Sequence, residues 1–337
     1  MRAALLVGPG RIEMGEVERP GTATGQVLVG IQTLGVCGTD RQIYSGAIPV
    51  SYPRIMGHEI VGHVLDSTEG FAAGARVIVD PSIACGRCDR CLEGRGNICA
   101  DGWLLGRDRD GGLQEAISAP AANLHRLPNE VVDAVAPLIQ VLTTCVHGQR
   151  MVDVFPGESV VIVGLGVTGL LHLQLAKMRG AWPVVCVTRS ERKLDLARDL
   201  GADVTVRSGE GSLEQIREAT RGGADVTIEC AGKVATLAQA VGFARPGGRI
   251  LAYGTIAETE GAFPFYDLYY KELAISNARA ARPEDFPVAI GSVASGRVRL
   301  EPLVTHRFPL TEADAAFRAD EMPEALKVVV DVQGLEG

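Results

Sequence analysis

The chain has 337 residues and a net charge of −8; 46% of it is hydrophobic, 41 residues are glycine and eight are cysteine. This composition suffices for ordinary buried cores and excludes a disordered chain, and the length favours about two domains. The acidic balance is atypical of nucleic-acid binding, and no uncharged apolar stretch reaches the ~18 residues of a membrane helix. The first residues lack a signal-peptide pattern, so we expect a cytoplasmic protein with no nucleic-acid and no membrane partner.

An alternating apolar run over 27–31 predicts a strand, and a second run over 60–64 predicts another. Four candidate metal ligands or ligand neighbours lie between these runs: Cys37, Asp40, His58 and Glu59. Thiolate and imidazole are ligand types that catalytic zinc uses, and the carboxylates beside them can bind a metal or orient a ligand. Ordinary alternatives stay open, with Cys37 a small core residue and His58 a loop histidine whose hydrogen bonds are satisfied.

Four cysteines follow within fifteen positions, spaced C-x2-C-x2-C-x7-C: Cys85, Cys88, Cys91 and Cys99. Four thiolates at such short spacings can close a tetrahedron around zinc and leave no position open for substrate, which is typical of a structural site. The interleaved Arg87, Arg90 and Arg95 would offset the negative charge of the thiolates. An iron–sulfur cluster is the main alternative, although the Cys-Pro ending of ferredoxins is missing, and a set of redox thiols is another.

A buried strand is predicted over 158–163, and a glycine-rich loop follows it directly: Gly164, Leu165, Gly166, Val167, Thr168 and Gly169. A helical pattern over 170–177 comes next, and this strand–loop–helix context gives the G-x-G-x-x-G spacing its meaning. The first glycine permits a tight turn, the second a close approach of the pyrophosphate, and the third close packing of helix on strand. The sequence therefore predicts a dinucleotide site with its phosphates at a helix N-terminus.

The residue that follows the next predicted strand, over 184–187, indicates whether such a fold prefers NAD or NADP. An acidic residue about 20 positions past the fingerprint binds the ribose 2′-hydroxyl of NAD, but Thr188 occupies that place. Basic and hydroxyl side chains follow it: Arg189, Ser190, Arg192 and Lys193. This cluster suits the 2′-phosphate of NADP, so we expect NADP in preference to NAD. The alternative is a set of solvated charges at the start of a helix predicted over 191–200.

Strands and helices continue to alternate after this point. The patterns predict a strand over 226–229, a helix over 235–243, a turn over 245–248 and a strand over 249–254. Alternation of this kind predicts a parallel, doubly wound sheet, so the expected fold class is α/β.

The order of these motifs resembles that of zinc-containing medium-chain alcohol and polyol dehydrogenases, over almost the whole chain. The resemblance rests on Cys37-Gly38-Thr39-Asp40, Gly57-His58-Glu59, the four cysteines and the glycine-rich loop. It implies a β-rich, GroES-like catalytic domain over 1–149 and 277–337, with a Rossmann domain inserted over 150–276. It also implies a zinc-dependent oxidoreductase that transfers a hydride between an alcohol, polyol or sugar hydroxyl, or the corresponding carbonyl, and a nicotinamide cofactor.

The same resemblance assigns roles around a catalytic zinc. Cys37 and His58 would bind the ion, Glu59 would lie at or near it, and Thr39 would pass on the substrate proton. Asp40 would orient the imidazole ligand, as such sites generally require. Together with the structural site in the four-cysteine lobe, two zinc ions per chain are expected.

Further positions acquire expected roles through the resemblance. Thr144 and Lys327 match positions at the cofactor. The position of Lys327 contacts pyrophosphate in relatives, although Lys327 by itself is typical of an ordinary charge at the edge of a strand. Glu115 matches a position that binds sugar hydroxyls in glucose dehydrogenases, with a structural carboxylate as its alternative. Relatives usually supply Cys, Asp or Glu as a third zinc ligand where this chain has Gln140, whose uncharged carbonyl can still bind zinc.

Two other functions stay open on the sequence. The first is a zinc-independent, quinone-reductase-like enzyme, against which Cys37, His58 and the four-cysteine lobe argue. The second is a non-catalytic, NADP-binding zinc protein, which the departures at Gln140 and Gln42 keep open. Gln42 stands near the place of a relay histidine in relatives. The expected partners are a small-molecule substrate and further copies of the chain, in a dimer or tetramer.

Overall fold

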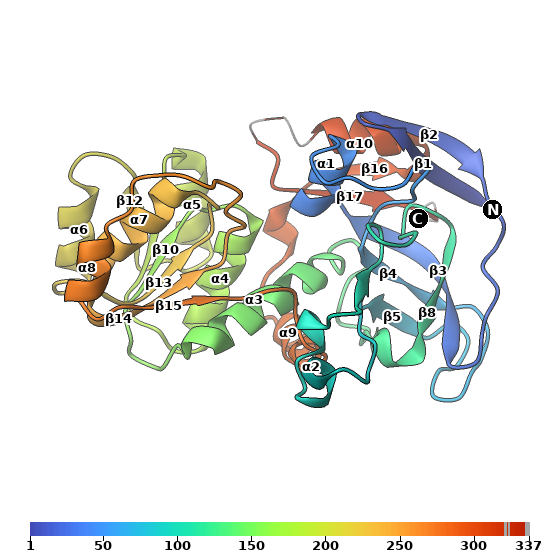
Figure 1. Cartoon of the computed structure of the whole chain (residues 1–337), viewed down its shortest axis with the longest axis horizontal. Helices are drawn as coiled ribbons and strands as arrows, with labels where there is room; N and C mark the ends of the chain where they lie inside the picture. The colour runs from blue at the N-terminus through green and yellow to red at the C-terminus, as the bar shows by residue number, and fades with distance from the viewer. Residues whose placement is uncertain (320–321, 323, 334–337) are drawn as a thin grey trace. The chain divides into compact units, whose positions relative to one another are not determined.

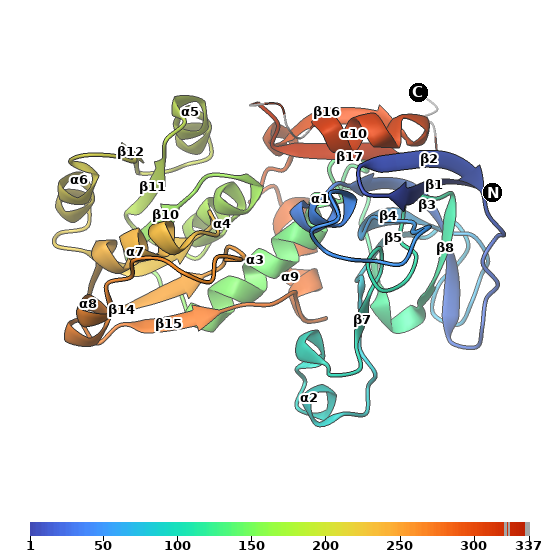
Figure 2. The same cartoon turned by 45° about the horizontal axis from the view of Figure 1, so that its top comes forward.

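The computed structural model describes residues 1–319, 322 and 324–333. The chain folds into two compact units (Figures 1 and 2). The β-rich unit consists of Met1–Thr143, Ala281–Ser295 and Leu300–Gly337, and the α/β unit of Thr144–Ala280 and Gly296–Arg299. The first boundary falls inside helix α3 (Leu138–Val152), a few residues before the predicted junction. The second falls a few residues after its predicted place, and no sequence pattern marks the short return at 296–299.

The β-rich unit is built around the long strand β3 (Gln26–Gly35). Its main sheet has the order β16-β17-β3-β4-β5-β9, and β8 also pairs with β3. The other strands are β1 (Arg2–Gly8), β2 (Arg11–Glu16), β4 (Glu59–Val64), β5 (Arg76–Val79), β6 (Ser82–Ile83), β7 (Trp103–Leu104), β8 (Ala116–Pro120), β9 (Leu124–Arg126), β16 (Val304–Pro309) and β17 (Lys327–Asp331). Its helices besides α3 are α1 (Gly38–Tyr44), α2 (Asp89–Leu92), α9 (Asp285–Ala294) and α10 (Ala313–Ala319), with short 3-10 turns at Gly96–Ile98, Ala121–Asn123, Glu301–Leu303 and Leu310–Glu312.

The alternating apolar residues of β3 and β4 form the core of this unit. Val29, Ile31, Ile60 and Val64 are completely buried and belong to one hydrophobic cluster. Burial of each such side chain stabilises the fold by about 1.5–3 kcal/mol. The strands predicted over 27–31 and 60–64 are confirmed, and their antiparallel pairing places Gly35 opposite Glu59.

The α/β unit contains a six-stranded parallel sheet of order β12-β11-β10-β13-β14-β15. Its strands are β10 (Val160–Val163), β11 (Val184–Thr188), β12 (Val204–Arg207), β13 (Ala224–Glu229), β14 (Ala244–Ala252) and β15 (Ala274–Asn277). Its helices are α4 (Val167–Met178), α5 (Glu191–Asp199), α6 (Ser212–Ala219), α7 (Val234–Phe243) and α8 (Phe265–Tyr270). This strand order is that of doubly wound dinucleotide-binding folds, which bind ligands at the carboxyl ends of the strands.

The central strands of this sheet are continuous apolar runs because helices cover both faces. Val161 and Val163 pack with Ile216 of α6 and Val241 of α7, while α4 and α5 pack on β10, β11 and β12. The strands and helices predicted between 158 and 243 are confirmed, so the fold class is α/β with a GroES-like and a Rossmann unit.

One predicted element is wrong in detail. The turn expected over 245–248 is part of strand β14, which begins at Ala244 because Ala244 pairs with Ala224 before a register shift. The strand also ends at Ala252, so Tyr253 stands just beyond the carboxyl end of the sheet.

No helix among the described residues is long and apolar enough to cross a membrane.

Candidate metal and cofactor sites

Three potential ligands converge in the β-rich unit. Cys37 stands at the N-cap of α1, just after β3, and His58 and Glu59 stand at the start of β4. Because β3 and β4 pair with Gly35 opposite Glu59, the two chain segments meet at one end of the sheet. The ligand atoms of Cys37, His58 and Glu59 lie within 4.8 Å of one another, and we call this group the open triad.

Asp40 fixes both the helix start and the imidazole of the open triad. One of its oxygens accepts the backbone N–H of Cys37 at 3.0 Å, and the other lies 3.1 Å from His58 Nδ1. This contact leaves the other ring nitrogen, Nε2, for a metal, which is the arrangement of carboxylate–histidine–zinc sites. Burial raises the pKa of Asp40, but the neighbouring His58 outweighs it, so the carboxyl is held below its usual pKa and available as an acceptor.

Glu59 is completely buried and shares its carboxylate with Lys327. The Lys327 ammonium lies 2.6 Å from each carboxylate oxygen, but it donates a hydrogen bond only to Oε1 and another to the Val36 carbonyl at 3.0 Å. The second oxygen, Oε2, has no hydrogen-bond partner. A Cβ on Gly35 would stand 2.0 Å from this oxygen, so only glycine leaves room for it. Lys327 is thus held inside the β-rich unit at Glu59, a contact that the expected pyrophosphate role does not predict.

The open triad fits zinc by its chemistry. Thiolate, imidazole and carboxylate are ligands that zinc accepts, and three protein ligands leave the fourth position of a catalytic site open. Glu59 Oε2 is buried and lies beside the Lys327 ammonium but accepts no hydrogen bond, so it is the carboxylate oxygen that could bind a cation. Thr39 lies half-buried on α1, two residues after Cys37.

Two residues expected at this site show other contacts. Both oxygens of Glu115 bind Arg2, one through the guanidinium at 2.7 Å and one through the backbone N–H at 2.9 Å. This favours the structural alternative for Glu115 over sugar binding. Gln140 is half-buried in the first turn of α3, where its main-chain carbonyl accepts the Thr143 hydroxyl at 2.6 Å.

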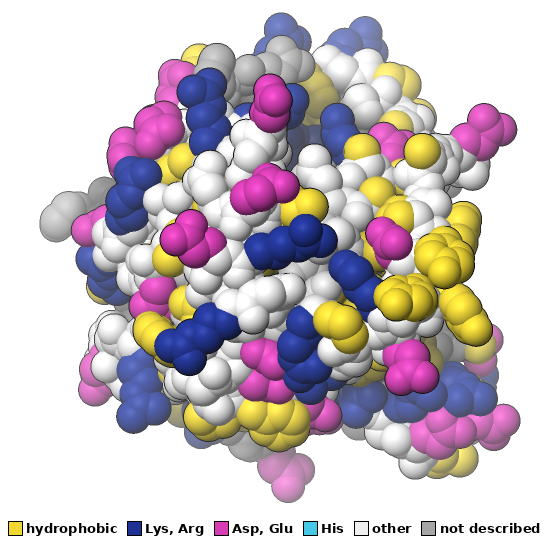
Figure 3. Space-filling model, turned by 90° about the vertical axis from the view of Figure 1, so that its left-hand side faces the viewer, with side chains coloured by type: hydrophobic (Ala, Val, Ile, Leu, Met, Phe, Trp, Pro, Cys, Tyr) yellow, Lys and Arg dark blue, Asp and Glu magenta, His cyan; other side chains and the backbone are white. Residues whose placement is uncertain are grey.

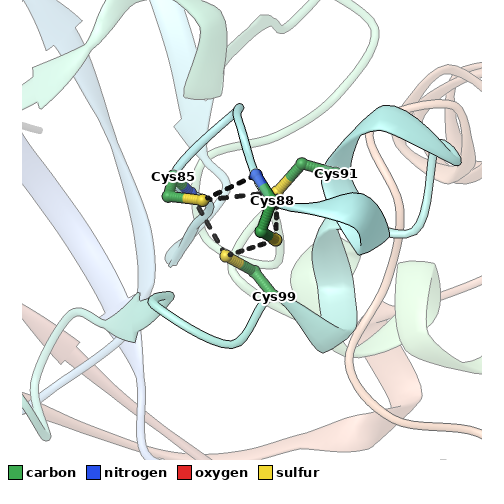
Figure 4. A group of neighbouring side chains, drawn as sticks. All are labelled: Cys85, Cys88, Cys91 and Cys99. Atoms are coloured by element: carbon green, nitrogen blue, oxygen red, sulfur yellow. Dashed lines mark hydrogen bonds between the residues drawn. The ribbon is translucent and has the colours of Figure 1, made fainter.

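The four cysteines of the lobe form a second, closed group, the cysteine cage (Figure 4). The sulfur of Cys88 lies 3.5 Å from that of Cys91 and 3.7 Å from that of Cys99, and Cys85 and Cys91 are 3.9 Å apart. Four Zn–S bonds of ~2.3 Å in a tetrahedron require sulfurs about 3.8 Å apart. The cage therefore fits one zinc ion, whereas the thiolates of a four-iron cluster each bind a different iron.

The glycine-rich loop has the shape that a dinucleotide requires. Gly164 follows β10 with φ +91°, and a Cβ on Gly169 would stand 2.0 Å from the Gly164 carbonyl oxygen. A Cβ on Gly166 would meet nothing within 4 Å, which is the open space that a pyrophosphate needs before the N-terminus of α4. Leu165 lies in the loop itself, and Val167 and Thr168 begin the first turn of α4.

The residues expected to distinguish NADP from NAD lie around the first turn of α5. Thr188 ends β11, Arg189 is exposed, and Ser190 is the N-cap of the helix. The pKa of Lys193 is lowered, chiefly by burial and then by the positive charge of Arg192. Arg192 and Lys193 are therefore close enough for their charges to interact.

Sequence patterns miss two side chains at the same edge of the sheet. The Tyr253 hydroxyl, just after β14, lies 2.6 Å from the hydroxyl of Thr144 and receives the thiol of Cys145 at 3.5 Å. Arg207 ends β12 directly beside Thr188. Neither lies in a recognisable motif, and only strand pairing and helix packing place them there.

An open thiol–imidazole–carboxylate site, a closed cysteine cage and a dinucleotide-binding sheet in one chain define a zinc-binding, nicotinamide-dependent oxidoreductase. The comparisons agree: residues 23–129 match the alcohol dehydrogenase GroES-like domain and residues 167–295 the zinc-binding dehydrogenase domain. The chain belongs to the family of zinc-containing medium-chain alcohol dehydrogenases and is an enzyme of that family. Its membership argues against both the zinc-independent and the non-catalytic alternatives.

Similar proteins cover nearly the full chain. Sorbitol dehydrogenase of Halalkalibacterium halodurans is 31% identical over 96% of both chains. L-galactonate-5-dehydrogenase of Escherichia coli K12 is 32% identical over 90% of both. Among solved structures, a zinc-binding dehydrogenase of Sinorhizobium meliloti 1021 bound to NADP has a TM-score of 0.91 and 31% identity, covering 98% and 99% of the two chains. The alcohol dehydrogenase rspB of E. coli CFT073, complexed with NADH, has a TM-score of 0.91 and 29% identity over 98% and 99%.

Proposed function

We propose that the enzyme transfers a hydride between a hydroxyl of a polyol or sugar, or the corresponding carbonyl, and NADP. The observation that carries the proposal is the open triad, in which Cys37, His58 and Glu59 converge and one buried Glu59 oxygen lacks a hydrogen-bond partner. The relatives named for sorbitol and L-galactonate support the class of substrate.

In the proposed mechanism the protein positions a metal and moves a proton. Zinc, when bound, supplies Lewis-acid polarisation of a substrate oxygen, and nicotinamide, when bound, accepts or returns the hydride. Cys37 and His58 hold the ion, and Asp40 locks the imidazole in one orientation. Thr39 takes the hydroxyl proton during oxidation and gives it back during reduction.

Lys327 and Gln140 complete the proposed metal environment. Lys327 pairs with both oxygens of Glu59 and donates a hydrogen bond to Oε1, so its proposed role is to position this ligand rather than to bind pyrophosphate. Gln140 is a proposed neutral ligand. Zinc content and kcat that both stay unchanged in Gln140→Ala would exclude Gln140 from this role.

The cofactor proposal rests on charge. Arg189, Arg192 and Lys193 surround the start of α5, where an NAD-specific enzyme carries a carboxylate. One solved relative is bound to NADP and another is complexed with NADH, so both cofactors occur among similar proteins. The choice between NADP and NAD in this chain therefore depends on these side chains. Gly164, Gly166 and Gly169 hold the pyrophosphate, and Thr144 lies at the nicotinamide end.

A substrate screen tests the proposal. Zinc-loaded enzyme is assayed with NADP and NAD against polyols, aldoses and simple secondary alcohols, with zinc measured on the same sample. We expect about two zinc ions per chain and kcat/KM at least roughly tenfold higher with NADP than with NAD, a ratio that Arg189→Ala lowers. A preference for NAD, or a ratio unchanged in Arg189→Ala, would overturn the cofactor proposal, and inactivity on every hydroxyl would overturn the substrate class.

We also propose that copies of the chain associate through α8 and β15. Phe265, Tyr266, Tyr269 and Tyr270 of α8 are 71–79% exposed, and β15 is an edge strand of its sheet. Figure 3, which faces this side of the α/β unit, shows hydrophobic side chains gathered at its right-hand margin among charged ones. Exposed aromatic clusters mark interfaces, and an unpaired edge can pair with its own copy about a two-fold axis.

The solution mass tests this association. Replacement of Tyr269 and Tyr270 by Ser is expected to reduce a dimer or tetramer to a smaller species in light scattering. A matched double replacement of exposed aromatics elsewhere, Phe155 and Trp182, is expected to leave the mass unchanged. A monomeric wild-type enzyme would contradict the proposal.

A further inference from the structure

Strand β12 places a further cation beside the predicted 2′-phosphate site. In the parallel register of β11 and β12, Arg207 pairs with Thr188, and the backbone N–H of Ser208 donates to the Thr188 carbonyl at 2.9 Å. Paired residues in neighbouring strands are about 5 Å apart and project to the same face of the sheet. Arg207 therefore leaves the sheet directly beside the residue at which NAD and NADP are distinguished.

The contacts of the residues before Arg207 show on which face of the sheet Arg207 lies. Thr205, two residues earlier on the same face, accepts a hydrogen bond from Arg198 of α5 at 2.9 Å. Val206, on the opposite face, is buried with Ile216 of α6. Arg207 consequently lies on the face that α5 covers. Because α5 runs back along the strands, its first turn stands at the carboxyl edge, level with Arg207.

The charges around this position leave Arg207 available. Its side chain is exposed, and its guanidinium has no hydrogen bond or ion pair with the part of the chain that the structure describes. Of the nearby carboxylates, Glu191 is already paired with Arg198 at 3.3 Å, and Glu210 stands in the exposed loop that follows β12. The cations Arg189, Arg192 and Lys193 lie across the edge of the sheet, on α5 and the turn before it.

We propose that Arg207 is a specificity-determining residue that binds the 2′-phosphate of NADP from the second strand, opposite the cations of the α5 turn. The inference rests on the NADP preference proposed above and extends it to a residue outside the fingerprint. A guanidinium binds phosphate through two parallel N–H donors, and such a contact discriminates against a cofactor that has only a hydroxyl at this place. Arg207 thereby selects the cofactor and takes no part in hydride transfer.

Cofactor binding tests the role of Arg207 without an activity assay. Fluorescence titration of the zinc-loaded enzyme gives Kd for NADPH and NADH in wild type, Arg207→Gln, Arg207→Lys and Arg217→Gln. Arg217 is the matched control, because it is an exposed arginine on α6, which covers the other face of the sheet. Loss of a charge-assisted contact predicts a roughly tenfold or greater rise in the Kd for NADPH in Arg207→Gln.

The same variant should leave the Kd for NADH within about twofold, since NADH lacks the phosphate that the charge-assisted contact serves. Arg207→Lys should fall between wild type and Arg207→Gln, and Arg217→Gln should match wild type. Competition by 2′-AMP against 5′-AMP provides a second readout, in which only 2′-AMP loses affinity.

Two kinds of failure can be told apart. If wild type prefers NADPH and Arg207→Gln keeps that preference, or loses both cofactors equally, the role of Arg207 is wrong and the NADP proposal stands. If wild type binds NADH as tightly as NADPH, both proposals are overturned.

Discussion

The open triad and the cysteine cage are both built to hold one metal ion, and they differ in nearly every other respect. The cage uses four identical ligands from one short, half-buried lobe, and three pairs of its sulfurs already stand 3.5–3.9 Å apart. The open triad combines three ligand types from two segments, with Asp40 in contact with His58 and Lys327 in contact with Glu59. Four protein ligands fill the coordination sphere of zinc and leave no position for substrate, whereas three protein ligands leave one position open. The comparison shows that the residues that position metal ligands, Asp40 and Lys327, lie at the site where chemistry is expected.

Removal of His58 should have the largest effect. In His58→Ala the open triad loses a ligand and the partner of Asp40, so zinc should fall from about two to about one per chain. Loss of a Lewis acid worth several kcal/mol should lower kcat/KM by roughly a thousandfold or more. Atomic absorption and steady-state kinetics on one preparation measure both. Full activity at one zinc per chain would show that the triad is not the reactive site.

The matching replacement of one ligand of the cage should lower the local stability of the lobe. Cys88→Ser is also expected to lose one zinc. Because α2 has no buried residue, the lobe then lacks both a core and a metal. Hydrogen exchange over 85–99 should accelerate by on the order of a hundredfold, while activity per folded chain falls far less than in His58→Ala. Equal losses of activity in the two variants would abolish the distinction between the sites.

Lys327→Met tests the support behind the triad. In metal-depleted protein this change leaves the Glu59 carboxylate buried without its cation, which should lower the free energy of unfolding by about 3–5 kcal/mol. Lys177→Met, which breaks the more exposed pair with Asp203, is the control and should lower it by less than about 1 kcal/mol. Urea titrations compare the two. Zinc should restore part of the loss only in Lys327→Met, because Glu59 then has a cation again.

Gly35→Ala is expected to have a smaller effect. Its Cβ would stand 2.0 Å from Glu59 Oε2, so Glu59 must shift, at about 1–3 kcal/mol and with weaker zinc binding. Gly8→Ala provides the control, because its Cβ would meet nothing within 4 Å. Unchanged stability and zinc affinity in Gly35→Ala would mean that Glu59 is not held where the triad needs it.

The two regions also differ in how far the sequence predicts them. The cage and the glycine-rich loop are local patterns: the spacing of the cysteines favours a zinc site, and the strand and helix on either side of the loop give its glycines their meaning. The roles in the open triad came from a family resemblance, because Cys37 and His58 have ordinary alternatives when read singly. The ion pair of Lys327 with Glu59 joins residues 268 positions apart, and no local pattern carries such a contact. Arg207 is similar, since only the register of β11 and β12 places it beside Thr188.

The most direct test of the account is stepwise removal of zinc. Aliquots taken during exposure to a chelator are assayed together for zinc per chain and for NADP-linked hydride transfer. An open site with mixed ligands should release its ion before a closed cage of four thiolates. The account predicts that activity falls to zero as zinc falls from about two to about one per chain, with the remaining ion bound by the cage. Activity that persists at one zinc per chain and disappears only with the last ion would contradict it.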